Sequence, residues 1–128
     1  MAPGQKFDDG KLEMGNFFGQ FPNALKGLCT VAQYGKIKYC EGNGNTNFKD
    51  VPDSITRYRD ALTRHLIAYL AGEYLDDESK CPHLFHIMWN AAALIEVDKE
   101  GVEFDIKYAL DKDRIIALVR EKALSSQK

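Results

Sequence analysis

Apolar residues recur at helical spacing in several stretches of the chain, and polar residues separate these stretches. The first helix is expected to begin at Pro22, because proline fits the first turn of a helix, and to end near Gly35. Its apolar positions follow the helical period and would share one face: Leu25, Leu28, Cys29 and Ala32.

A second amphipathic stretch follows Pro52-Asp53-Ser54, which supplies a helix N-cap. Gly72 predicts the end of this helix. Its apolar stripe consists of Ile55, Tyr58, Leu62, Leu66, Tyr69 and Leu70.

A third stretch, from Pro82 to about Glu96, is apolar on almost all sides, so this helix should be central. The alternation from Val102 to Tyr108 predicts a short strand, and Asp111 or Asp113 can cap a last helix. The apolar residues of that last helix are Ile115, Ile116, Leu118 and Val119.

The remaining segments are polar and rich in glycine. Residues 1–20 predict an extended arm, and the run from Gly42 to Asn47 predicts a loop. The pattern therefore predicts an all-α fold: a small helical bundle of about four helices with an N-terminal arm and one short strand. A chain of 128 residues suits a single domain, residues 1–128.

Charge and cysteine content exclude several classes of protein. The net charge of −2 provides no basic field for non-specific nucleic-acid binding, and no apolar run approaches the length of a membrane span. Cys29, Cys40 and Cys81 are odd in number and form no CxxC pair, which is typical of free thiols in a reducing compartment. We therefore expect a cytoplasmic protein with no nucleic-acid or membrane partner.

Carboxylates are concentrated directly before the third helix. Glu73 and Asp76 stand three residues apart, a spacing that lets two carboxylates share a cation on one side of a helical turn. Asp77 and Glu78 add repulsion, which either water or a divalent metal relieves. Carboxylate oxygens favour Mg²⁺ or Mn²⁺. A solvated acidic loop is the alternative interpretation.

His83, His86 and Asn90 share one face of the third helix. A buried helix carries such groups only when hydrogen bonds or a ligand satisfy them, so structural and functional roles are both open. Cys81 with His83 and His86 can also be interpreted as a zinc site, although the nearby ligands are mainly oxygen.

Cationic groups lie upstream of the acidic cluster. Lys36, Lys38 and Arg64, with the Gly/Asn run, could bind a triphosphate. Arg64 could instead pair with Asp60 on a solvated helix face, and the two lysines and the Gly/Asn run could equally be exposed surface. The common nucleotide motifs GxxxxGK[ST] and GxGxxG are absent, as are the GxSxG elbow and the His-Asp dipeptide.

The order of these motifs resembles that of a phage family, the dATP/dGTP diphosphohydrolases, which are related to the all-α MazG/HisE pyrophosphohydrolases. The resemblance covers roughly residues 6 to 96. It is carried by Lys6-Phe-Asp8-Asp9-Gly10-Lys11, Gly35-Lys36-x-Lys38-Tyr39 and a Gly-Asn turn, then by Arg57-Tyr-x-Asp60-Ala-Leu-x-Arg64-His65-Leu, Gly72-Glu73-x-x-Asp76-x-Glu78-Ser79, and Pro82-His83-Leu-x-His86 with Asn90.

This resemblance implies hydrolysis of dGTP or dATP to the monophosphate and pyrophosphate, with two or more Mg²⁺ or Mn²⁺ ions per site. It also implies a homo-oligomer, either a dimer or a tetramer. In phages that replace adenine with 2-aminoadenine, the enzyme would remove dATP and supply dGMP. The alternative from a different class is a non-catalytic helical protein that binds a nucleotide or another protein.

The resemblance also implies site residues. Glu73, Asp76 and Glu78 would hold the metals, and His83 would orient a ligand or relay a proton. The chain departs from the MazG pattern, in which a Glu-x-x-Glu pair precedes a Glu-x-x-Asp pair, and the family often has proline at Asp77. Glu78, His83 and Asn90 are therefore candidates to complete the metal shell. Substrate-binding residues would be Lys36, Lys38, Tyr39, Asn45, Arg64, His65, His86 and Asn90.

Overall fold

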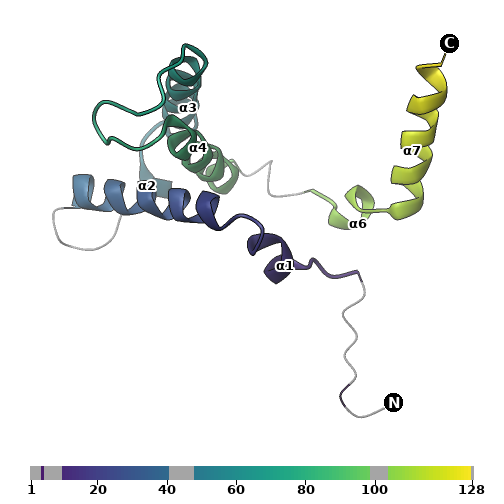
Figure 1. The fold of residues 1–128 in the computed structure, drawn as a ribbon. Coiled ribbons are helices and arrows are strands. Elements are labelled where there is room, and N and C mark those ends of the chain that lie inside the picture. The colour runs from purple at the N-terminus through teal and green to yellow at the C-terminus, as the bar shows by residue number, and fades with distance from the viewer. Residues whose placement is uncertain (1–3, 5–9, 41–47, 99–103, 128) are drawn as a thin grey trace. The chain divides into compact units, whose positions relative to one another are not determined.

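The computed structural model describes residues 4, 10–40, 48–98 and 104–127. These residues contain no sheet, which confirms the all-α prediction; their strand-like pairing is an antiparallel bridge between Leu75 and Pro82. The helices are α1 (Met14–Phe18), α2 (Pro22–Cys40), the 3-10 helix η1 (Phe48–Asp50), α3 (Ser54–Leu70), α4 (His83–Val97), α6 (Ile106–Ala109) and α7 (Lys112–Ser125) (Figure 1).

The chain divides into two compact units. One unit is Glu13–Val102, which contains α1 to α4, and the other combines Met1–Leu12 with Glu103–Lys128, which contains α6 and α7. The expectation of a single domain remains a prediction. None of the helices in the described ranges is both long and apolar enough to cross a membrane.

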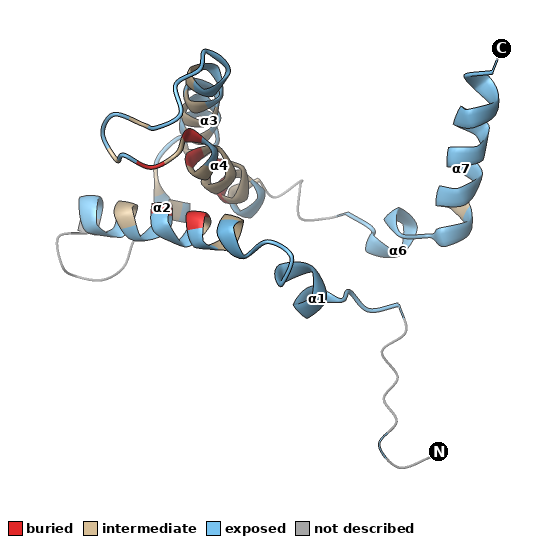
Figure 2. Cartoon of the chain, in the orientation of Figure 1, coloured by how far each residue is buried: buried red, intermediate tan, exposed pale blue. Residues whose placement is uncertain are grey.

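Helix α4 is central to the first unit, as its composition predicts. It packs against α2, α3 and η1. Figure 2 shows the buried positions of this unit on α2 and around α4. Every third or fourth residue of α4 faces inwards. The buried residues of this helix are His83, His86, Asn90 and Ala93, and all of them except Ala93 are polar.

Helices α2 and α4 approach closely at Gly27. A Cβ atom at this position would lie 2.6 Å from Cδ1 of Phe85, so glycine is the residue that permits the contact. Val31, one turn further along α2, is buried with 6% of its surface exposed. The contact places the second half of α2 beside the polar stripe of α4.

Two predicted helix boundaries are confirmed. Helix α3 begins after Asp53 and ends at Leu70, just before Gly72, which has a φ of +95°. The N-cap differs in detail, since Asp53 is left-handed (φ 54°) and its side chain makes no capping hydrogen bond. Helix α7 follows Asp111, whose side chain accepts from the backbone N–H of Arg114.

Three expectations about local structure were wrong in part. Helix α2 continues through Gly35 to Cys40, because one interior glycine costs only about 1 kcal/mol relative to alanine. The strand expected over 102–108 is helical at Ile106–Ala109, where the Asp105 side chain accepts from the Tyr108 N–H and caps α6. The N-terminal arm is helical at Met14–Phe18. The loop expected over 42–47 lies outside the described residues.

Candidate active site

The acidic connection between α3 and α4 is an ordered turn. The Asp76 N–H donates to the Cys81 carbonyl at 2.8 Å, and the His83 N–H donates to the Tyr74 carbonyl at 2.9 Å. Lys80 adopts a left-handed conformation, with φ 61°, that lets the chain reverse direction. This turn brings its carboxylates towards the polar stripe of α4.

Asp76 is held in place by Ser79. The Ser79 N–H and hydroxyl both donate to Asp76 Oδ2, each at 2.8 Å. Burial raises the pKa of the Asp76 carboxyl, but these two hydrogen bonds, together with the nearby His86 and His65, outweigh that effect and the net pKa is lowered. Asp76 is therefore an ionised carboxylate at neutral pH.

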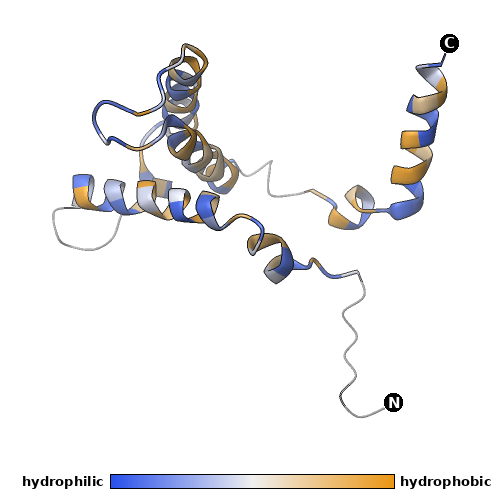
Figure 3. Cartoon of the chain, viewed as in Figure 1, coloured by the Kyte–Doolittle hydropathy of each residue, from blue (hydrophilic) through white to orange (hydrophobic). Residues whose placement is uncertain are grey.

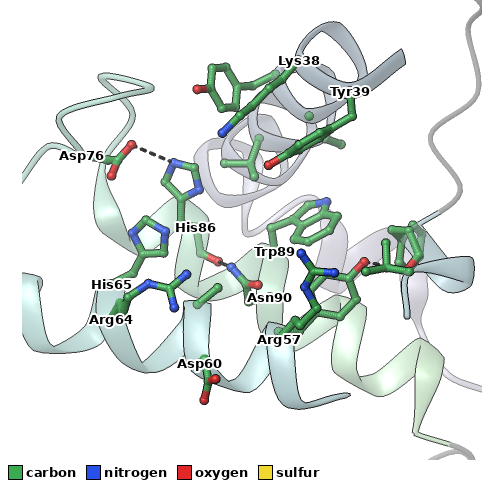
Figure 4. Close-up of a pocket in the computed structure, with 18 of the residues that line it drawn as sticks. Lys38, Tyr39, Arg57, Asp60, Arg64, His65, Asp76, His86, Trp89 and Asn90 are labelled. Carbon is green, nitrogen blue, oxygen red and sulfur yellow. Dashed lines mark hydrogen bonds and ion pairs between the residues drawn. The ribbon is translucent and has the colours of Figure 1, made fainter. Parts of the chain in front are cut away.

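His86 is joined to Asp76 through Ser79, and these three residues form a first hydrogen-bond relay. Its Nε2 lies 2.7 Å from Ser79 Oγ and 3.9 Å from Asp76 Oδ2. Because the Ser79 hydroxyl donates to Asp76, its oxygen accepts from His86 Nε2–H. A neutral His86 then carries its lone pair on Nδ1, on the side of the ring away from Asp76 (Figure 4).

A second relay runs from Glu73 through His83 to His65. His83 Nε2 lies 3.0 Å from Glu73 Oε2, and the Nδ1 atoms of His83 and His65 are 2.8 Å apart. An ionised Glu73 only accepts, so His83 donates from Nε2 and accepts at Nδ1. His65 consequently donates from Nδ1 and keeps a lone pair on Nε2.

The histidines of the two relays contact each other. The rings of His65 and His86 stack with centroids 4.3 Å apart and an interplanar angle of 4°. Burial lowers the pKa of each ring, and positive charge on neighbouring side chains lowers it further: His86 and His83 act on His65, and His83 and Lys38 act on His86. Asp76 opposes this shift in both cases. Both rings are therefore neutral at pH 7, and the lone pairs assigned above are available.

Three candidate metal ligands come together at the junction of these relays. One ligand atom each from His65, Asp76 and His83 lies within 4.8 Å of the other two. Cys81 is buried in the adjacent turn, but it belongs to no such group within the described part of the chain. Among the described residues, Cys81 therefore forms no zinc site with His83 and His86.

Glu78 lies apart from this cluster and pairs with Lys38 of α2. The Lys38 Nζ to Glu78 Oε1 distance is 2.6 Å. Their hydrogen bond raises the pKa of Lys38 and lowers that of Glu78. The Lys38 ammonium also lies 5.1 Å from the ring centroid of Tyr39. The charge of Glu78 is thus already balanced by a protein cation.

A pocket of about 1200 Å³ opens between α2, η1, α3 and α4 (Figure 4). Many of the residues predicted for the site line it: Lys38, Tyr39, Arg64, His65, Asp76, Glu78, His86 and Asn90. Asn90 donates to the backbone carbonyl of His86 at 2.8 Å.

The other predicted residues lie elsewhere. Glu73 and His83 do not line the pocket but contact its wall through His65. Lys36 is exposed on α2 and does not line the pocket. Asn45 lies outside the described residues.

Sequence reasoning missed the aromatic part of this pocket. Trp89, Tyr58 and Phe48 line it, together with Arg57. Trp89 follows His86 by three residues and Tyr58 precedes His65 by seven, so helical spacing could have placed both near the histidines. Ser79, which connects Asp76 to His86, was part of the motif series but was assigned no role.

The unit that contains α1 to α4 is helical, and carboxylates, histidines and cationic side chains line its pocket beside aromatic rings. A family model described as "dATP/dGTP diphosphohydrolase, N-terminal" matches residues 1–107. The chain therefore belongs to the dATP/dGTP diphosphohydrolase family, as its motifs suggested. No curated protein and no solved structure matched the chain.

Proposed function

We propose that this chain hydrolyses dATP and dGTP to the monophosphate and pyrophosphate. The observation that supports this most directly is the convergence of Asp76, His65 and His86 on one wall of the pocket, in a chain of this family. The pocket also supplies Arg64, which forms no ion pair with Asp60 among the described residues and is available to phosphate.

A divalent cation would fit the donor set of His65, Asp76 and His83 once His83 Nδ1 gives up the hydrogen bond that it accepts from His65. Two imidazoles and one carboxylate suit Mn²⁺ or another transition ion better than Mg²⁺, which prefers oxygen. Such an ion, when bound, neutralises phosphate charge and lowers the pKa of bound water. Glu73 would act behind His83, as carboxylates that orient metal-ligating histidines do.

His86 is the residue best placed to accept a proton from the attacking water. Its ring is neutral at pH 7, and the hydrogen bond from Nε2–H to Ser79 leaves Nδ1 free to accept. Lys38 and Arg64 would neutralise the phosphates that leave as pyrophosphate. Lys38 would have to exchange its contact with Glu78 for the substrate.

We further propose the biological setting that the resemblance implies. The enzyme would act in the host cytoplasm during phage replication, lowering dATP and supplying dGMP for 2-aminoadenine synthesis. It would act as a dimer or tetramer, since α3 presents large apolar side chains to solvent, including Ile67 at 62% and Leu70 at 73% exposure.

Product analysis tests the proposed reaction. The purified chain is incubated with dGTP or dATP and Mn²⁺, and the products are separated by ion-exchange chromatography. We expect monophosphate and pyrophosphate in equal amounts, and no turnover in EDTA. Release of intact tripolyphosphate would contradict the reaction, and nucleotide binding without turnover would favour the non-catalytic alternative.

A further inference from the structure

The two ends of the pocket differ in chemistry. Asp76 and His65 lie at one end, and Trp89 and Arg57 lie on the other side of His86 (Figure 4). Pocket residues run along α3 from Arg57 to His65, a rise of about 12 Å at 1.5 Å per residue. A nucleotide also has two chemically different ends, because the ribose separates its charged phosphates from its aromatic base.

Three aromatic rings form the end away from Asp76. Trp89 meets Phe48 at a centroid distance of 5.7 Å and Tyr58 at 5.5 Å, both edge to face. The Tyr58 hydroxyl donates to the Phe48 carbonyl at 2.6 Å, which fixes Tyr58 against η1. All three side chains remain partly exposed and line the pocket. They therefore form a rigid apolar wall that a planar ligand can reach.

We propose that Trp89, supported by Tyr58 and Phe48, forms the subsite for the purine base. This assignment rests on the proposed function, which places the phosphates beside His65 and Asp76. Stacking on aromatic rings tolerates either purine, because both present a large π face, and a pyrimidine covers less of the indole. The subsite thus accounts for one pocket that accepts both dATP and dGTP.

Trp89 is the only tryptophan in the chain, so its fluorescence reports directly on this subsite. Wild-type protein is excited at the red edge of tryptophan absorption and titrated with dGMP, dCMP and inorganic tripolyphosphate. We expect saturable quenching by dGMP, weaker quenching by dCMP, and none by tripolyphosphate. Equal quenching by tripolyphosphate, or none by dGMP, would overturn the assignment.

Kinetics of variants provide a second test. Trp89→Leu should raise the KM for dGTP about 10-fold with a smaller change in kcat, and Trp89→Phe should restore most of the affinity. Tyr69→Leu removes an aromatic ring from α3 outside the pocket and should leave KM unchanged. An unchanged KM in folded Trp89→Leu would contradict the subsite.

The subsite and the proposed reaction can fail separately. If wild-type protein releases pyrophosphate from dGTP while dGMP leaves Trp89 fluorescence unaltered, the reaction stands and the subsite is wrong. If dGMP quenches Trp89 but no dNTP is hydrolysed, the proposed reaction is wrong and the base subsite stands.

Discussion

At the scale of residues, the site is a set of buried polar groups that satisfy one another. His83 is only 3% exposed and Asn90 only 5%, yet no buried side-chain nitrogen or oxygen in the described residues lacks a partner. Leaving such a group unpaired would cost about 1 to 3 kcal/mol, so the histidine relays contribute to folding as well as to the site. Each relay also determines which ring nitrogen carries a proton.

Glu73 determines which ring nitrogen carries the proton in both His83 and His65, and Glu73→Gln tests this role. The amide keeps the shape of the side chain, but it can donate as well as accept, so His83 and then His65 lose their preferred tautomer. We expect kcat/KM for dGTP to fall about 10- to 100-fold, with helical circular dichroism unchanged. Asp77→Asn, which removes an exposed charge from the same turn, is the matched control. Retained activity in Glu73→Gln would remove Glu73 from the site.

The lowered pKa values of His65 and His86 predict a pH-dependent stability in EDTA. In the unfolded chain His65 and His86 bind protons with the ordinary histidine pKa of 6.5, whereas in the folded chain their pKa is lowered and they bind protons only at lower pH. The free energy of unfolding should therefore decrease as the pH falls through 6.5 towards the folded values, and level off about one pH unit above 6.5. Urea denaturation across roughly pH 5 to 8 measures this. A free energy of unfolding that rises on acidification would contradict the prediction, and His65→Gln should weaken the dependence.

Sequence spacing could identify many of these residues but not their contacts. The 3.6-residue period places His83, His86 and Asn90 on one face of α4. It says nothing of which face of α3 lies opposite, so the meeting of His65 with His83 could not be derived. For the same reason Glu78 was grouped with Asp76, although it pairs with Lys38, forty residues away. Such pairings are decided by tertiary packing.

At the scale of elements, the close contact of α2 with α4 positions the pocket, and Gly27→Ala tests it. The added methyl would overlap the Phe85 ring, so we expect the free energy of unfolding to decrease by about 1 to 3 kcal/mol. Gly35→Ala is the matched control, because its Cβ would meet nothing within 4 Å, and it should stabilise α2 by about 0.5 to 1 kcal/mol. Urea denaturation compares the two variants.

A double mutant separates the steric effect from other causes. In a Phe85→Leu background, the cost of Gly27→Ala should shrink, because the ring that the methyl meets is gone. An equal cost in both backgrounds would show that the loss of stability does not come from this contact.

The helices were more predictable than their connections. The periodic segments of α3 and α4 were placed within one or two residues of their observed ends, since long amphipathic patterns and caps specify helices strongly. The alternation of apolar and polar residues before Tyr108 wrongly predicted a strand. The hydrogen bond from the Tyr108 N–H to Asp105 caps a short helix there, and it outweighs the preference of a short alternating pattern for a strand.

At the scale of the whole molecule, most large apolar side chains remain exposed. Within the described residues none of the large side chains is fully buried, and the buried apolar residues are Val31, Cys81 and Ala93. Helix α7 carries apolar residues beside polar ones (Figure 3), and its Val119 is 61% exposed. A stable homodimer buries about 1,600 Å² in total, so partner copies offer the means to cover such surface.

The outward face of α3 is where this expectation can be tested most directly. Ile67 and Leu70 lie on the side of α3 opposite the residues that pack on α4, and a pair of carboxylates there would be costly to bury between two copies. We expect wild-type protein to sediment as a dimer or tetramer, and the Ile67→Glu, Leu70→Glu double variant as a monomer with unchanged helical content. Ile37→Glu, at a similarly exposed isoleucine of α2, is the control and should retain the assembly. Dissociation by Ile37→Glu but not by the α3 variant would move the interface to α2, and a monomeric wild-type protein would mean that this surface is not an interface between copies.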